Sequence, residues 1–328
     1  MKGWLLLIAS IALGLSLFVG VLTIAGVSNI VSEFRNISIF YLTLFLLAGL
    51  VPASIYVLRW KQIIARSGFR IPFMNLVSYK FMGFPVSYLT PAARLGGEPL
   101  RAFMLSRHGV GMNKSFSLVL LDKALENLTE VGFGSLLIVG ILILKPDVKH
   151  KALLLIAIAV VLSIILFFYY LVSQRVKPLS LILRLSGMGK FKAFRNLRKN
   201  IREVEHHFIR FVHSNPRAVL EAIVITVLAW PFILLEYKLA LAAIGYDIAV
   251  QYVFLFVMFA SVSSLVPIPG AIGIFEAMQF SVFTLFGLNP YIALALAFLV
   301  RFRDLIWTLA GLVLILIFSL RELPGGKK

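Results

Sequence analysis

Two stretches of this 328-residue sequence combine proline, glycine and charged residues within otherwise hydrophobic surroundings. The first contains Pro91, Arg94, Gly96, Gly97, Glu98, Pro99 and Arg101, and the second contains Pro267, Pro269, Gly270, Gly273 and Glu276. Each places a glutamate seven residues after a proline, with glycine between them. In hydrocarbon, a broken backbone and a carboxylate are both costly, so neither persists without a compensating environment. In a membrane protein, two such breaks predict where the function lies.

The first break has the features of an anion site. Adjacent Gly96 and Gly97 predict positive φ angles and unpaired backbone N–H groups. A helix that begins at the following proline would point its positive N-terminus at the same place, so we expect Arg94 and Arg101 to bind a lipid phosphate there. Glu98 would neutralise an arginine when no lipid is bound, or contact an amine of the head group. Alternatively, Glu98 pairs with Arg101 only to hold the loop.

The second break predicts the same backbone freedom and a second buried charge. Glu276 is expected one to two turns into the following helix, deep enough to require a partner. Arg301 or Arg303 would supply it, because both lie about ten residues into the final span, near mid-membrane by helical rise. The predicted translocation network comprises Pro267, Pro269, Gly270, Gly273, Glu276, Arg301, Arg303 and Asp304. Asp304 competes for Arg303, and a purely structural ion pair is the alternative.

Three carboxylates recur every four residues between the two breaks. Asp122, Glu126 and Glu130 therefore share one face of a predicted helix. They could belong to a cation or proton path. For Glu126 and Glu130 we favour the alternative, in which they are solvated or paired with Lys123 and nearby arginines.

The elements that position these residues are membrane helices. The chain is 60% hydrophobic and only 14% charged, whereas soluble domains average about 25% charged residues. We expect a single domain, 1–328, with no additional large soluble domain. The apolar run 4–27 is too long for a signal-peptide core of about 7–15 residues and is expected to be retained. The sequence has no cysteine and no nucleotide-binding or hydrolase motif, and it predicts no metal or cofactor.

Hydrophobic length predicts an all-α integral membrane fold with six full spans. These are expected at 3–27, 39–60, 115–144, 152–174, 218–245 and 291–320. Two further hydrophobic regions, 72–108 and 251–288, contain the breaks and are predicted to be broken helical hairpins.

The distribution of positive charge predicts the orientation. Segment 175–217 holds eleven Lys and Arg against two acids, a net charge of +9 within the +18 of the whole chain, and is therefore cytoplasmic. Arg59, Lys61, Arg66 and Arg70 are assigned to the same side, as are both chain termini. Both ends of 72–108 are then cytoplasmic and both ends of 251–288 external, so the two hairpins form an inverted repeat. The cluster of Lys145, Lys149 and Lys151 conflicts with this assignment, and two ordinary kinked helices remain the alternative.

The basic segment also predicts an amphipathic helix lying on the cytoplasmic leaflet. Its apolar face is expected to contain Phe191, Phe194, Leu197, Ile201, Val204, Phe208 and Phe211. Its opposite face carries Lys192, Arg195, Lys199, Arg202 and Arg210. Anchoring is favoured over lipid gathering as its role. Because the excess charge lies between hydrophobic spans, nucleic acid is not an expected partner.

The two breaks resemble the flippase-like membrane domain of lysylphosphatidylglycerol synthases, which also occurs alone and fused to glycosyltransferases. The resemblance covers nearly the whole chain, and Asp122-Lys123, Arg301 and Gly311 match positions where that family carries charged or small residues. It adds Asp122 and Lys123 to the expected lipid-binding set. The chain departs from the family at Ala271, where glycine is expected, and at Lys123, where arginine is commoner.

The resemblance implies lipid translocation without lipid aminoacylation, because the soluble aminoacyl-transferring domain is missing. We therefore expect a flippase of the cell membrane that moves an anionic phospholipid or a polyprenyl-phosphate-linked lipid. A glycosyltransferase or aminoacyltransferase partner is consistent with the family. The alternatives are a membrane-bound transferase with Asp122 and Glu126 as its base, and a non-catalytic scaffold that recruits an enzyme through 175–217.

Overall fold

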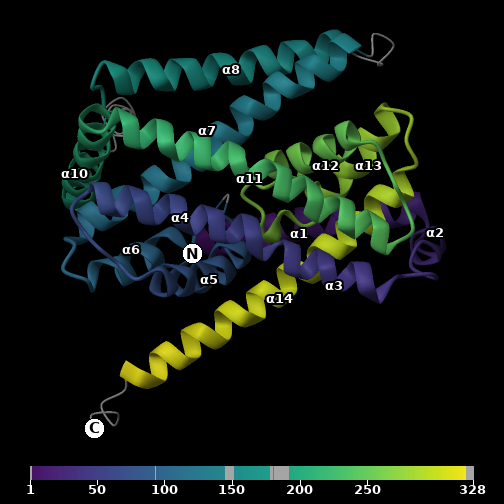
Figure 1. Ribbon diagram of the computed structural model, residues 1–328, viewed down its shortest axis with the longest axis horizontal. Coiled ribbons are helices and arrows are strands. Elements are labelled where there is room, and N and C mark those ends of the chain that lie inside the picture. Colours follow the sequence, from purple (N-terminus) through teal and green to yellow (C-terminus); the bar gives the residue numbers. More distant parts are fainter. Residues whose placement is uncertain (1, 93, 145–150, 178–179, 181–191, 323–328) are drawn as a thin grey trace.

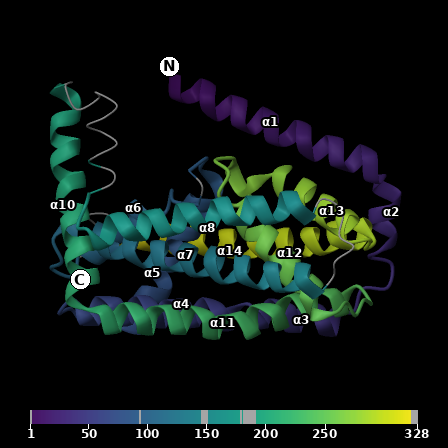
Figure 2. The same ribbon diagram turned by 90° about the horizontal axis from the view of Figure 1, so that it is seen from above.

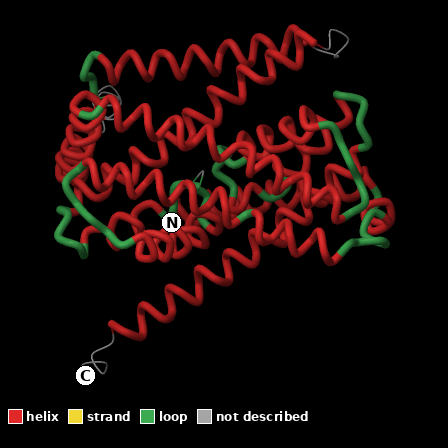
Figure 3. Tube along the Cα trace, viewed as in Figure 1, coloured by secondary structure: helices red, strands yellow, loops and turns green. Residues whose placement is uncertain are grey.

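The computed structural model describes residues 2–92, 94–144, 151–177, 180 and 192–322, and all regular structure in these residues is helical (Figure 1). Most helices lie side by side along one direction, but the short α2 (Val27–Ser32) and the basic α10 (Lys192–Ser214) do not. Helix α1 (Lys2–Ala25) runs obliquely away from the others in Figure 2, and the end of α14 (Pro290–Glu322) leaves the bundle diagonally in Figure 1. Loops gather at both ends of this bundle and also in its middle (Figure 3). Loops inside a bundle are unusual because their backbone polar groups need partners there.

Six helical stretches occupy the ranges in which spans are predicted. They are α1 (Lys2–Ala25), α3 and α4 (Ile39–Ala48 and Leu50–Arg66), α7 (Met112–Leu144), α8 (Lys151–Ser173), α11 (Pro216–Ala243) and α14 (Pro290–Glu322). Within the described residues, four stretches are long and apolar enough to cross a membrane: Ile39–Arg66, Met112–Ile143, Pro216–Ala243 and Pro290–Arg321. The prediction of an all-α membrane protein is confirmed.

Each of the two break regions forms a pair of shorter helices. The first pair is α5 (Phe73–Leu89) and α6 (Glu98–Ser106), and the second is α12 (Val250–Ser263) and α13 (Ile274–Leu285). A short 3₁₀ turn, η2 (Pro269–Ala271), lies within the second break and contacts α5. In Figure 1, α5 starts from the left end of the bundle and α12 from the right, so the breaks meet near its centre.

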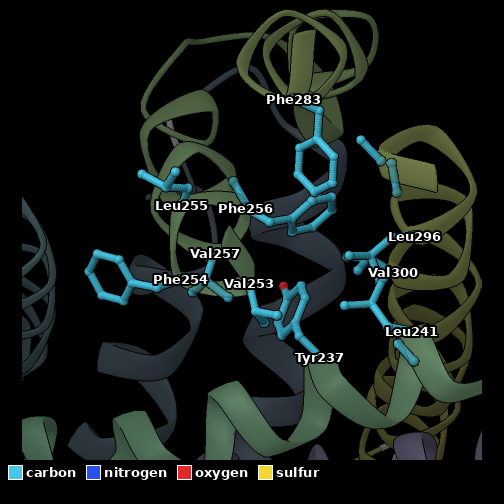
Figure 4. Close-up of a cluster of buried hydrophobic side chains, with 14 of the residues drawn as sticks. Tyr237, Leu241, Val253, Phe254, Leu255, Phe256, Val257, Phe283, Leu296 and Val300 are labelled. Atoms are coloured by element: carbon cyan, nitrogen blue, oxygen red, sulfur yellow. The ribbon is translucent and has the colours of Figure 1, made fainter. Parts of the chain in front are cut away.

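Aromatic and aliphatic side chains fill the half of the bundle that surrounds the second break. Phe256 of α12 is fully buried, and its ring packs edge-to-face on Phe283 of α13 with centroids 6.1 Å apart (Figure 4). The final helix approaches α5 closely because Gly311 has no side chain: a Cβ there would lie 2.2 Å from the Phe81 carbonyl oxygen. The first contact joins the two helices of the second pair, and the second holds α14 against α5.

Helix α10 crosses the left end of the bundle at a steep angle in both views (Figures 1 and 2). Val204 and Phe211 of its apolar face are buried, and the helix packs on α7. The prediction that this whole face meets lipid is therefore wrong for these two residues, which contact protein. Phe191 and the side chains of Phe194 and Leu197 lie outside the described residues.

Candidate functional site

A cavity of about 250 Å³ lies where the two breaks meet, and we call it the central cavity. Arg94 of the first break and Ser264 of the second both line it. Its charged lining residues are Lys80, Arg94, Glu98, Arg101, Lys123, Glu126, Glu130, Glu236, Arg303 and Asp304. Five are basic and five are acidic, so the lining is charge-balanced. Such a balance lets many charges persist inside an apolar bundle, because each sign compensates the other.

Asp122 of α7 lies outside the lining of this cavity and binds two arginines. It accepts from Arg59 Nε at 2.9 Å and from Arg101 Nη2 at 2.9 Å, and its side chain is fully buried. Arg59 also donates to Glu126 at 2.7 Å and to Thr226 Oγ1 at 2.9 Å. The assignment of Arg59 to a cytoplasmic connection is wrong, because α4 continues for about two more turns and buries it.

Arg101 also pairs with Glu98, the first residue of α6. Its Nη1 lies 2.8 Å from Glu98 Oε2, and its guanidinium stacks 4.2 Å above the Trp60 ring. Lys123 is similarly engaged, with Nζ 2.6 Å from Glu126 Oε1. The expected Glu98–Arg101 pair is therefore present. Lipid binding by Glu98, Arg101 and Lys123 stays a prediction, since Glu98 and Arg101 pair with each other and Lys123 pairs with Glu126.

The two glycines of the first break allow close packing, and they do not adopt the left-handed backbone conformation. Gly97 has φ −84°, and positive φ occurs in this break at Arg94 (58°), so the expected conformation of Gly96 and Gly97 is wrong. The Gly97 N–H is also paired, since it donates to Ser87 Oγ at 2.9 Å. A Cβ on Gly97 would lie 2.0 Å from the Gly83 carbonyl oxygen. Glycine is required here because α5 passes so close.

Two cations of the central cavity have no hydrogen-bond partner in the part of the chain that the structure describes. The buried Lys80 Nζ makes no hydrogen bond, and its nearest carboxylate, on Glu126, lies 3.9 Å away. The exposed Arg94 side chain forms no ion pair with any described residue. Glu130, on the same cavity wall, accepts a 3.0 Å hydrogen bond from Tyr56 and from no other described residue. Lys80 and Arg94 are thus the cations most available to an incoming anion.

The second break is held by Glu276 and Arg301. Arg301 Nε donates to Glu276 Oε1 at 2.8 Å, which confirms the predicted partner. Glu276 lies in the first turn of α13, not one to two turns deeper, because its Oε2 caps the helix by accepting the Gly273 N–H at 2.8 Å. Gly270 and Ala271 both have positive φ, 56° and 50°, so Ala271 adopts the conformation for which glycine is expected.

Tyr88 connects the second break to the first. It lies at the end of α5, and its hydroxyl accepts from Arg301 Nη1 at 3.0 Å. The same nitrogen donates to the Gly270 carbonyl oxygen. Sequence reasoning missed Tyr88, because a tyrosine in an apolar helix gives no signal of a partner more than 200 residues away.

Arg303 forms a second buried network on α14. It pairs with Glu236 of α11 and with Asp304, whose Oδ1 lies 2.9 Å from its Nη2. Its guanidinium also lies 5.1 Å from the centre of the Trp307 ring. The predicted competition by Asp304 is present. Glu236 was missed, although a carboxylate within an apolar stretch was an available signal.

The predicted site residues thus divide into those that line the central cavity and those that do not. The central cavity is lined by Arg94, Glu98, Arg101, Lys123, Arg303 and Asp304. Glu276 and Arg301 do not line it, and Pro267 is exposed at the edge of the second break. Within the described part of the chain, no cluster of three or more His, Asp or Glu side chains could hold a metal ion.

Together the fold and the site define a class: an α-helical membrane protein with a charged cavity between two broken helical pairs. Residues 7–311 match the family described as the lysylphosphatidylglycerol synthase TM region. This match covers most of the chain, and the protein belongs to that family.

Curated relatives are archaeal membrane proteins of similar length. A UPF0104 membrane protein of Methanothermobacter thermautotrophicus is 23% identical over 297 residues, 87% of each chain. UPF0104 membrane protein PH1989 of Pyrococcus horikoshii is 26% identical over 335 residues, 96% of this chain and 97% of the relative. UPF0104 membrane protein MJ1595 of Methanocaldococcus jannaschii is 23% identical over 312 residues, covering 92% and 91%. The chain therefore resembles whole proteins built as a membrane domain.

Proposed function

We propose that this protein is a lipid translocase of the cell membrane. Its substrate would be an anionic phospholipid or a polyprenyl-phosphate-linked lipid, whose head group passes through the central cavity while its chains stay in the bilayer. The observation that carries the proposal is a charged cavity between two broken helical pairs, with two cations, Lys80 and Arg94, that have no hydrogen-bond partner among the described residues. Inverted broken helices that meet near the membrane midplane are a recurrent transporter design.

The proposal includes six full spans and two re-entrant pairs. Helices α6, α12 and α13, with 9, 14 and 12 residues, are about 14, 21 and 18 Å long, too short for a hydrocarbon core of about 30 Å. The bundle end that carries α10 also carries the lysines and arginines of that helix, which supports placing it in the cytoplasm. Both chain termini would then be cytoplasmic.

Lys80 and Arg94 would provide the phosphate site. Both line the central cavity, and a charge-assisted hydrogen bond to a phosphate oxygen would satisfy each. Glu130 would face an amine-bearing head group, because the Tyr56 hydroxyl is the one hydrogen-bond partner of its carboxylate among the described residues. The remaining charges would keep the cavity polar without competing for lipid, since they already pair with one another.

A transferase fits the geometry less well. Of its proposed base pair, Asp122 has both oxygens occupied by Arg59 and Arg101 at 2.9 Å. The oxygens of Glu126 accept from Arg59 at 2.7 Å and from Lys123 at 2.6 Å, so neither carboxylate has an oxygen free to take a proton from a substrate. A partner glycosyltransferase or aminoacyltransferase remains compatible with transport. Such an enzyme would make or use the lipid that the cavity carries.

Reconstitution into vesicles tests the proposal. Fluorescent phosphatidylglycerol, phosphatidylcholine and a short polyprenyl phosphate would be placed in both leaflets, and quenching from outside would report exchange. We expect the protein to accelerate exchange of phosphatidylglycerol, the polyprenyl phosphate or both over protein-free vesicles. Rates equal to those of protein-free vesicles for every anionic lipid would refute translocation.

A further inference from the structure

A second, apolar cavity lies behind α7. Its volume is about 460 Å³, within the range of about 300–1,000 Å³ typical of ligand sites. Side chains of α7, α8, α10 and α11 line it, and all are hydrocarbon or aromatic except Thr129. We call this cavity the apolar groove.

Helix α7 separates the apolar groove from the central cavity. Leu121, Leu125 and Leu128 face the groove, whereas Glu126 and Glu130 of the same helix line the central cavity. An α-helix with its side chains is about 10 Å thick, so a ligand in the groove does not touch the charged network. The groove is therefore a separate site.

The groove has the length and depth of a lipid chain. Along α7 it runs from Leu121 to Leu136, about 22 Å by helical rise, and along α11 from Val219 to Val227, about 12 Å. One leaflet of the hydrocarbon core is about 15 Å deep. A slot of this length along two membrane-crossing helices fits an extended chain better than a compact ring.

Positive charge flanks one end of the groove. Arg175 follows the lining residue Val172 by three positions, and Arg217 precedes the lining residue Val219 by two. Both arginines are exposed, and neither forms an ion pair with a described residue. His213 Nε2 lies 3.2 Å from the Ser173 carbonyl oxygen, which holds the end of α10 against α8 at this same end.

Acids on the neighbouring elements are engaged elsewhere. Glu221 of α11 pairs with Arg66 at 3.0 Å, and Glu205 of α10 accepts from the Ser180 N–H at 3.2 Å. The end of the groove is therefore positive, with no acid paired to its two arginines. This charge complements an anionic head group above a chain seated in the groove.

We propose that the apolar groove binds one acyl chain of an anionic phospholipid, with its head group at Arg175 and Arg217. The lipid is a resident partner and not the cargo of the central cavity. The site requires that α7 and α11 cross the membrane, but it does not require that the protein moves lipid. Phosphatidylglycerol bearing a photoreactive diazirine at its chain end is the probe.

The wild-type protein would be irradiated in phosphatidylcholine vesicles that contain a trace of the probe, and adducts would be mapped by mass spectrometry. We expect adducts to concentrate on groove residues. Ala124→Trp should fill the groove and remove them, whereas Leu137→Trp, on the exposed face of α7, should not. If Ala124→Trp fails to fold, Ile223→Trp and Val224→Trp form the equivalent pair on α11, inside and outside the groove.

The head-group preference is measured with a matching phosphatidylcholine probe. A basic residue near an anionic lipid raises the binding affinity about fivefold. The double variant Arg175→Gln and Arg217→Gln should therefore lower phosphatidylglycerol labelling by at least about fivefold. Its phosphatidylcholine labelling should stay unchanged. Arg321→Gln, at the end of α14, is the control and should change neither. Adducts spread evenly over all lipid-exposed faces, or adducts that persist in the groove-filling variant, would overturn the proposal.

Discussion

Replacing Asp122 with alanine is expected to lower the free energy of unfolding by about 3–5 kcal/mol, because it breaks a buried ion-pair network. Asp122 joins α7 to Arg59 of α4 and Arg101 of α6, with both contacts at 2.9 Å. Its removal leaves two buried guanidiniums to share the carboxylates of Glu98 and Glu126. Denaturant titration of the purified protein in detergent measures the loss.

Two further variants test whether the loss of stability is specific to the buried charge of Asp122. Asp122→Asn keeps the shape but removes the charge, so it should also destabilise the protein and is useful if the alanine variant does not accumulate. Glu221→Ala breaks the exposed Arg66–Glu221 pair and should cost no more than about 1 kcal/mol. Equal stabilities of Asp122→Ala and the wild type would show that this network does not hold the first break in place.

The combined substitution Lys80→Met and Arg94→Gln is expected to reduce lipid exchange about 100-fold or more at limiting lipid. Each cation would lose a charge-assisted hydrogen bond to phosphate, worth about 1.5–3 kcal/mol, and each 1.4 kcal/mol corresponds to a factor of ten. Stability should change little, because Glu126, the carboxylate 3.9 Å from Lys80, keeps its closer partners Arg59 and Lys123, and exposed Arg94 forms no ion pair with a described residue. Exchange rates of fluorescent phosphate lipids, measured beside the unfolding curve, separate the two effects.

Arg107→Gln supplies a matched control for this pair. Arg107 lies at the end of α6 and stacks 5.2 Å from the centre of the Phe318 ring, outside the central cavity. Its removal should leave exchange unchanged. Full exchange in the Lys80/Arg94 variant would mean that these cations do not bind the transported head group.

The helices and their two breaks could be predicted because each depends on local sequence. A long apolar run needs a helix in lipid, and a run interrupted by proline and glycine cannot form one continuous helix. The Glu98–Arg101 pair was equally local, since the residues are three apart on one helix. The Arg301–Glu276 pair could be inferred because both charges lie at similar depth and need compensation.

Other parts of the site depend on which helices pack against each other, and this packing cannot be read from a single sequence. Arg59 looked like the basic end of a span, but packing against α7 and α11 buries it beside Asp122. Tyr88 gains its role only because α5 reaches the second break. Gly97 was correctly singled out, but for backbone freedom. Its actual role is to allow close packing, because a Cβ at this position would lie 2.0 Å from the Gly83 carbonyl oxygen.

Passage of the head group through the central cavity is the central claim, and a single introduced cysteine tests it. The chain contains no cysteine, and Ser261 of α12 lines the cavity, so Ser261→Cys offers one thiol at the proposed path. Leaflet exchange would be measured in the same vesicles before and after complete reaction with a sulfonate-bearing thiol reagent. Leu137→Cys, outside the cavity, is the control. We predict that modification at 261 stops exchange and that modification at 137 does not, whereas undiminished exchange after modification at 261 would contradict the account.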